Sequence, residues 1–131
     1  MSIGCLTSLE KSAITTLLER WPGSGHLAAD VVDSLIVKAR KFSEGVRDAT
    51  KCSGFYTHFE PNAVLHNIDG LPTHVSVHCK HPELELGVEF ILFLRTDGCA
   101  RFLEATFYAE LLDIEKVMSA DHAFKFFSDE P

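Results

Sequence analysis

The stretch Leu84-Glu-Leu-Gly-Val-Glu-Phe-Ile-Leu-Phe-Leu-Arg95, then Thr96-Asp-Gly98, then Cys99-Ala-Arg-Phe-Leu-Glu-Ala-Thr-Phe-Tyr108 decides the fold. Two runs rich in β-branched and aromatic residues flank an Asp-Gly pair, which is the strongest short-range signal for a β-hairpin. If Asp97 and Gly98 form a two-residue turn, Thr96 faces Cys99, and the numbers of each facing pair sum to 195. The rest of the fold can be built around this hairpin.

This register predicts two different faces for the hairpin. One face is almost continuously apolar, and we expect it to pack against helices. Its residues are Leu86, Val88, Phe90, Leu92 and Leu94 on the first strand, and Arg101, Leu103, Ala105, Phe107 and Ala109 on the second. The other face is mixed and carries Gly87, Glu89, Ile91 and Phe93 against Phe102, Glu104, Thr106 and Tyr108. A slip of one residue, or a bulge near Gly87, would reassign these faces.

Helices are predicted at both ends of the chain. Thr7 and Glu10 form a capping box, and the apolar periodicity that follows predicts a helix over residues 8–20. A second periodic run predicts a helix over residues 26–44, with Asp30 near its start and basic residues near its end, as the helix dipole favours. Ser119 is expected to cap a short helix that continues through Phe127.

The middle of the chain predicts strands. Residues 54–60 and 63–66 have strand composition, Asp69-Gly70 is a second candidate hairpin turn, and residues 73–80 alternate between apolar and polar side chains. Helices followed by strands favour an α+β class. We therefore expect a single α+β domain over residues 1–131, with two N-terminal helices packed on one face of an antiparallel meander sheet of about four strands and a short C-terminal helix.

The charge distribution limits the partners that we expect. The 131 residues carry a net charge of −7, and residues 51–131 hold thirteen acidic against six basic side chains. Such an acidic half disfavours direct nucleic acid binding and is compatible with a basic protein partner. The apolar runs are too short to span a membrane, and the N-terminus lacks the pattern of an export signal, so we expect a cytoplasmic protein with free thiols at its four cysteines.

Motifs that would indicate an enzyme are missing. The sequence has no phosphate-binding loop, dinucleotide fingerprint, zinc-protease helix or nucleophile elbow. These absences favour a non-enzymatic protein but do not exclude an enzyme. His74 and His78 share a strand face, but their Cα atoms would be ~13 Å apart, which is too far to bind one metal ion. We expect no metal and no cofactor.

The mixed hairpin face is the best candidate for a functional surface, and three interpretations compete. In the first, a small acidic, non-enzymatic protein inhibits or chaperones a protein partner through its sheet face or acidic C-terminal half, as immunity proteins of similar size and charge do. In the second, the concave side of a curved sheet holds a pocket for a small molecule or a reaction. In the third, the mixed face pairs with a second copy in a homodimer. The candidate binding residues are His58, His78, Glu89, Ile91, Phe93, Phe102, Glu104 and Tyr108.

Overall fold

A computed structural model describes residues 4–20, 28–61, 73–95 and 99–126. The elements are α1 (Ser8–Arg20), α2 (Ala28–Ser34), β1 (Val37–Glu44), β2 (Lys51–Phe59), β3 (His74–His81), β4 (Leu84–Leu94), β5 (Ala100–Thr106), β6 (Leu112–Asp113), α3 (Ile114–Met118) and β7 (Lys125–Phe126). The prediction of an antiparallel sheet with helices is confirmed. The finer expectation of about four strands and two long N-terminal helices is only partly met.

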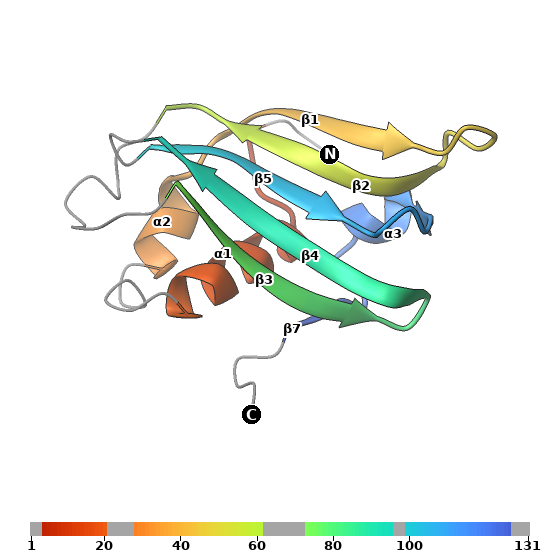
Figure 1. The fold of residues 1–131 in the computed structure, drawn as a ribbon. Helices are drawn as coiled ribbons and strands as arrows, with labels where there is room; N and C mark the ends of the chain where they lie inside the picture. The colour runs from red at the N-terminus through yellow and green to blue at the C-terminus, as the bar shows by residue number, and fades with distance from the viewer. Residues whose placement is uncertain (1–3, 21–27, 62–72, 96–98, 127–131) are drawn as a thin grey trace.

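The strands form one antiparallel sheet in the order β1-β2-β5-β4-β3-β7, and the short β6 pairs with β2. Strands β3, β4 and β5 follow one another as a meander, whereas β2 pairs with β5 rather than with β3. In Figure 1 the sheet curves across the view, with α1 and α2 behind it. The four central strands β2 to β5 match the prediction, and β1, β6 and β7 were not anticipated. The predicted strand at residues 63–66 and the Asp69-Gly70 turn lie outside the described residues.

The predicted register of the central hairpin is confirmed along most of its length. Residue numbers sum to 195 in each pair from Glu89–Thr106 to Phe93–Phe102. The Asp97-Gly98 turn itself lies outside the described residues. Next to it, Leu94 faces Ala100 rather than Arg101, because β5 carries one extra residue there, as in a β-bulge. The expectation that Arg101 belongs to the apolar face was therefore wrong, and its side chain is exposed.

A second irregularity lies at the other end of the hairpin, near Gly87. Cys79 faces Val88, but two residues further along β3 His81 faces Leu84, so the register shifts between them. Gly87 has a φ of +79°, a left-handed conformation that glycine adopts without a steric penalty. Leu86 is consequently 65% exposed, and its predicted place on the apolar face was wrong.

Helix α1 begins as the capping box predicts. The backbone N–H of Thr7 donates to Oε1 of Glu10 at 2.7 Å, and the N–H of Glu10 donates to Oγ1 of Thr7 at 3.1 Å. Its apolar side packs into the core on the inner face of the sheet, where the contributing residues are Leu9, Ala13, Ile14, Leu17 and Leu18 from α1 and Phe55, Phe90, Leu92, Leu103 and Phe107 from the strands. The predicted apolar face of the hairpin is therefore covered, and the opposite face stays open.

The prediction of a long second helix over residues 26–44 was wrong. Helix α2 ends at Ser34, and Val37–Glu44 form the edge strand β1, which pairs with β2 from Phe59 to Cys52. Val37 is buried on the inner face, and Arg40 reaches an ion pair with Glu10 of α1. These long-range contacts outweigh the local helical spacing. The basic residues that were assigned to a helix C-terminus lie on a strand instead.

The predicted C-terminal helix from Ser119 was also wrong. The helix present, α3, ends at Met118, and the chain then turns at residues 119–121 and leads into β7, which pairs with β3 at Cys79. Phe124 is buried, as expected, with its ring centroid 5.8 Å from that of Phe107. An extended segment brings both Phe124 and Phe126 against Phe90, which explains why a strand is formed. No helix among the described residues combines the length and the apolar composition needed to cross a membrane.

Candidate functional site

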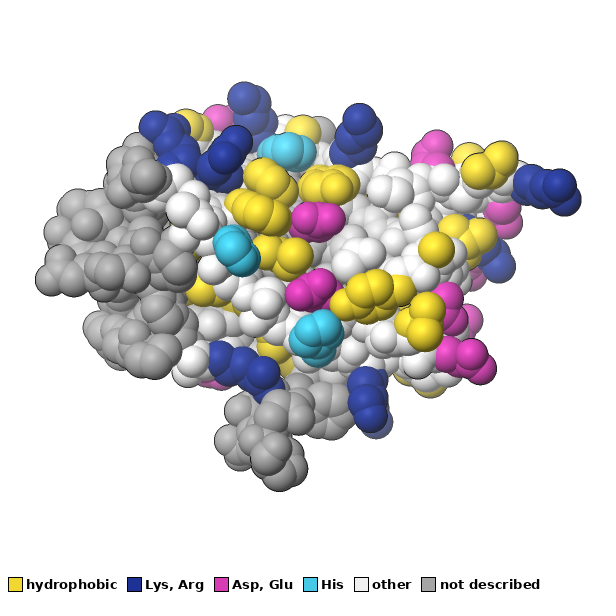
Figure 2. All heavy atoms as spheres, viewed as in Figure 1, with side chains coloured by type: hydrophobic (Ala, Val, Ile, Leu, Met, Phe, Trp, Pro, Cys, Tyr) yellow, Lys and Arg dark blue, Asp and Glu magenta, His cyan; other side chains and the backbone are white. Residues whose placement is uncertain are grey.

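The outer face of the sheet, which is the side away from α1 and α2, carries three cross-strand rows of side chains. Period-two alternation places every second residue of each strand on this face. From β1 to β3 the rows are Ala39, His58, Phe102, Phe93, His74; then Lys41, Tyr56, Glu104, Ile91, Ser76; then, from β2, Gly54, Thr106, Glu89, His78. We call these residues, with the bulge residue Arg101, the outer face. Figure 2 views it directly and shows hydrophobic side chains and histidines around acidic ones.

The first row is a continuous aromatic ladder across four strands. Phe93 and Phe102 stack with ring centroids 4.5 Å apart and planes inclined by 21°. His58 extends the ladder from β2, 5.4 Å from Phe102, and His74 extends it from β3, 5.9 Å from Phe93. The guanidinium of Arg101 lies 5.8 Å from the Phe102 ring centre, within the range of a cation–π contact. Each ring is therefore held in place by its neighbours.

Each of the two carboxylates on the outer face is paired with a tyrosine. The hydroxyl of Tyr56 donates to Glu104 at 3.2 Å, and that of Tyr108 donates to Glu89 at 3.3 Å. The charge of Glu104 raises the pKa of Tyr56, and burial together with the Glu89 charge raises the pKa of Tyr108. Both phenols therefore remain protonated donors at neutral pH. His78 lies next to the Tyr108–Glu89 pair, with its Nε2 3.9 Å from Oε2 of Glu89.

An unusual backbone brings Tyr108 to this position. Strand β5 ends at Thr106, and Tyr108 and Ala109 have φ values of +55° and +72°. Two successive non-glycine residues in the left-handed region are sterically costly, and such strain persists only where the surrounding contacts maintain it. Here the Tyr108 N–H donates to Oγ1 of Thr106 and the ring reaches Glu89 across the sheet. Ala109 is exposed rather than on the apolar face, contrary to the prediction.

The structure brings all eight predicted candidates together on this side of the sheet. Contacts link His58 to Phe102, Phe102 to Phe93, and Glu89 to both His78 and Tyr108. Ile91 faces Glu104 in the middle row. Sequence reasoning missed Tyr56, His74, Arg101 and Leu86. Tyr56 and His74 were detectable, since each lies an even number of residues from a named histidine on the same strand.

The outer face is not where the acidic excess lies. Within its three rows and Arg101, the two carboxylates Glu89 and Glu104 are balanced by the permanent cations Lys41 and Arg101, with three histidines beside them. More acidic than basic side chains lie instead on the elements at the end of the sheet with the β3–β4 turn, β6 and α3. The acidic ones are Glu83, Glu85, Glu110, Asp113, Glu115 and Asp121, and the basic ones are Lys51 and Lys116. The sheet face and the acidic end, which the sequence offered as alternatives, are therefore distinct surfaces.

A buried ion pair on the inner side was not visible in the sequence. Arg40 donates from Nη2 to Oε1 of Glu10 at 2.7 Å and from Nε to Oε2 at 2.9 Å, and the Thr57 hydroxyl also donates to this carboxylate. Burial alone would raise the pKa of Glu10, but the hydrogen bonds from Arg40, Thr57 and the Thr7 N–H lower it below its ordinary value. The carboxylate is fully enclosed and its donors are all protein groups. This network joins α1 to β1 and β2 and leaves no open position for a ligand.

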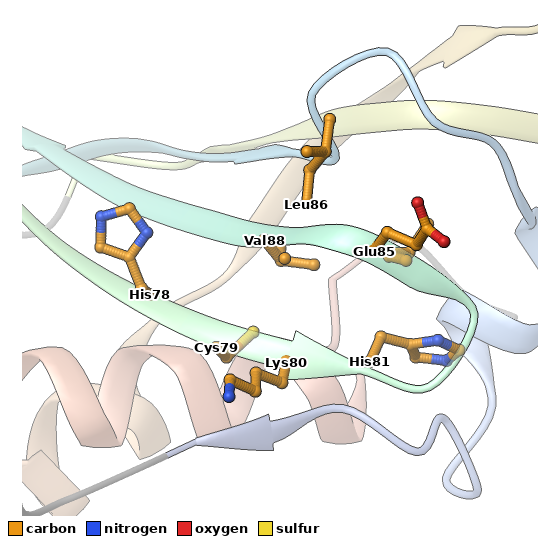
Figure 3. Close-up of a pocket in the computed structure, with 9 residues that line it drawn as sticks. His78, Cys79, Lys80, His81, Glu85, Leu86 and Val88 are labelled. Atoms are coloured by element: carbon orange, nitrogen blue, oxygen red, sulfur yellow. The ribbon is translucent and has the colours of Figure 1, made fainter.

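A hollow of about 340 Å³ lies at the β3–β4 hairpin, beside the bulge at Gly87 (Figure 3). Its floor includes Cys79, and burial raises the pKa of this thiol to about 12, so the thiol is not a nucleophile at neutral pH. His81 is engaged on both ring nitrogens, by the His122 carbonyl and by the Glu83 N–H. Leu86 points away from Val88 in Figure 3. The thiol of Cys79 and the ring of His81 are therefore not available for chemistry. The other titratable side chains that line the hollow, His78, Lys80 and Glu85, are exposed to solvent rather than enclosed.

Within the described residues, no three His, Cys, Asp or Glu side chains lie close enough together to hold a metal ion. Comparisons with protein-family models, curated proteins and solved structures give no match. The residues and geometry of the outer face are therefore the basis for inferring a function.

Proposed function

We propose that this chain is a non-enzymatic protein-binding domain and that the outer face is its recognition surface. The observation that carries the proposal is the aromatic ladder from His58 to His74, which stays partly open to solvent on a face that no other described element covers. Aromatic and arginine side chains are enriched in the buried centres of protein interfaces. Leu86 and Tyr108, 65% and 37% exposed, extend the same apolar surface toward the hairpin end.

The side chains of the outer face are held in place by contacts with one another, which supports a role in binding. Ring-to-ring contacts hold Phe93 and Phe102, and the tyrosine hydroxyls hold both carboxylates. Side chains that are already immobilised lose less conformational entropy when a partner covers them. Glu89 and Glu104 each bring one satisfied hydrogen bond into the interface, which reduces the cost of removing water from them. The side chains of the outer face are therefore preorganised for binding.

The alternative of a small-molecule pocket on the concave side of the sheet, with His58, His78, Glu89, Glu104 and Tyr108 as its residues, has less support. The hollow at the β3–β4 hairpin is lined by His78 but by neither Glu89 nor Glu104. The covered side of the sheet is filled by the core. Leu9, Ile14 and Leu17 of α1 fill the space against the sheet, and each is at most 2% exposed. An enzyme site needs at least two titratable groups that converge in an enclosed space. On the covered side, Glu10 is fully bonded to protein donors, burial raises the pKa values of Cys52 and Cys79, and protein groups engage both ring nitrogens of His81.

We infer a protein partner, which this domain would inhibit or chaperone by covering it, and a cytoplasmic location. The balanced charges of the outer face favour a partner of mixed charge rather than the basic partner that the overall charge suggested. Four free cysteines favour a reducing compartment.

The test compares three forms of the chain as immobilised bait in an extract of the native host. The double variant Phe93→Ser/Phe102→Ser removes the centre of the aromatic ladder. Val46→Ser, at a fully exposed loop position, is the matched apolar-to-serine control. We expect wild type and Val46→Ser to retain the same protein and the double variant to lose it, with circular dichroism confirming that all three are folded. Equal recovery by all three forms would refute the proposal.

A further inference from the structure

We propose that the occupant of the outer face is a second copy of this chain, so that two sheets pack face to face in a homodimer. This inference rests on the proposed function, because it names the partner of the same surface. It follows from two observations, the balance of charges on the outer face and the area that the face offers.

The charges on the outer face match those of a second copy of itself. Glu89 and Glu104 occupy its centre, Lys41 lies at the β1 margin, and Arg101 lies above the aromatic ladder. A two-fold contact presents the same set of charges on both sides, so charges of a single sign would repel their own copies, whereas a set with both signs can pair with itself. The acidic excess at the far end of the sheet would make two copies repel one another there. The outer face lets them meet away from that repulsion.

The area of the outer face can also be compared with the area that a stable dimer needs. Its rows cross up to five strands that are ~4.8 Å apart, and the three rows span about five residues of each strand at ~3.3 Å per residue. The sheet therefore offers roughly 24 Å by 17 Å, or about 400 Å² in projection. Protruding rings increase the accessible area toward the ~800 Å² that each partner contributes to a standard interface. Two sheets that pack in this way interdigitate their side chains across ~10 Å.

A single-stranded nucleic acid is the other macromolecule that binds rings on an open sheet, and the geometry favours it less. Base stacking needs ring faces that lie open to solvent. Phe93 and Phe102 instead stack on each other at 4.5 Å, so that part of each ring face is already occupied. Glu89 and Glu104 would also repel the phosphates of a strand that crosses the face.

Sedimentation velocity over a range of concentrations tests the inference on the full chain. We expect wild type to approach twice the 14.6 kDa mass of one chain as its concentration rises. Ile91→Lys replaces an apolar side chain of the middle row with an ammonium beside Glu104, and burying this charge in the interface should weaken association at least ~30-fold. Ser76→Lys adds the same charge at an exposed position of that row and guards against a folding defect. Val46→Lys, in the exposed β1–β2 connection, is the matched control and should associate like wild type.

The outcomes separate this inference from the proposed function. A wild-type monomer at every concentration overturns the homodimer; if Ile91→Lys then loses a captured host protein, the proposed function stands with a different partner. A dimer that both lysine variants leave intact overturns the assignment of this face. A monomer that binds a fluorescent oligouridine, with loss of binding in Phe93→Ser/Phe102→Ser, also overturns the homodimer and replaces it with single-stranded nucleic acid.

Discussion

Replacing Arg40 with methionine should destabilise the chain strongly at neutral pH and much less in acid. Arg40 forms a bidentate ion pair with Glu10, whose side chain is 0% exposed, and also donates to the Cys5 carbonyl at 2.6 Å. Methionine fills similar volume but leaves the carboxylate without its cation. The Thr7 N–H and the Thr57 hydroxyl remain as donors. Arg47→Met removes an exposed arginine from the β1–β2 connection and is the matched control.

The magnitude follows from the burial of the pair. Breaking a buried ion pair by removing one partner costs about 3–5 kcal/mol, because an uncompensated charge stays behind. For 131 residues, an unfolding entropy of about 2.1 cal/mol/K per residue converts this loss into a fall of roughly 11–18 °C in melting temperature. Arg47→Met should change it by less than about 2 °C.

The pH dependence gives the sharper test. In wild type the pKa of Glu10 is lowered below 4.5, so its contribution to stability is complete above that pH and is lost as pH falls through the folded-state pKa. In Arg40→Met, burial should instead raise the pKa of Glu10 above its unfolded value, so the variant gains relative stability as pH falls from 7 toward about 4.5. Urea unfolding at both pH values measures the difference. A loss below about 1 kcal/mol at pH 7, or a loss that does not shrink in acid, would refute the reasoning.

Three further predictions concern other parts of the structure. Burial lowers the pKa values of His81 and His122 below 6.5, so the folded state binds fewer protons than the unfolded chain, and stability should fall between about pH 7.5 and 5.5; urea midpoints should show a smaller fall for His81→Gln, and an unchanged slope would contradict the assignment. Gly54→Ala should lower the free energy of unfolding by about 2–4 kcal/mol, because φ is +149° and a Cβ would lie 2.2 Å from a β5 backbone oxygen. Gly4→Ala, with positive φ but open space, should lower it by only about 1 kcal/mol. Equal losses of the two variants in thermal unfolding would exclude the steric cause. With a thiol reagent, Cys5 should react in the native state and the three buried cysteines only after unfolding; a second fast thiol would show that the core opens readily.

The hairpin register and the face that carries the candidate residues were predicted from local sequence patterns, because both depend on residues close together in the chain. The Asp97-Gly98 pair predicted the register that holds from Glu89–Thr106 to Phe93–Phe102. Next to the turn the pairing differs, since the Arg95 N–H donates to the Cys99 carbonyl, and the extra residue in β5 restores the predicted pairs. The same period of two placed His58 and His78 on the face that carries Glu89. The arrangement of the candidate residues was therefore accessible from the sequence, although what they bind was not.

The features that were not predicted depend on contacts between residues far apart in the sequence. Residues 37–44 keep helical spacing of apolar side chains, yet pairing with β2 and the Glu10–Arg40 contact across 30 positions turn them into a strand. Both bulges reverse side-chain direction. Gly87 marked one of them as possible from the sequence, whereas no composition signal marks the bulge at Arg101. Leu86 was misplaced because of the bulge near Gly87.

The edge strand β1 has a consequence for how large an assembly can grow. It carries exposed Lys38 and Lys41, and its pairing with β2 is interrupted by irregularities between Val37 and Ala39 and between Phe42 and Glu44. Charged side chains and bulges discourage another strand from adding to an edge. Chains that are prevented from joining edge to edge cannot extend into a fibril along this side of the sheet, even at concentrations where their faces meet. Association would then stop at a closed pair, which lets an exposed aromatic surface persist without polymerisation.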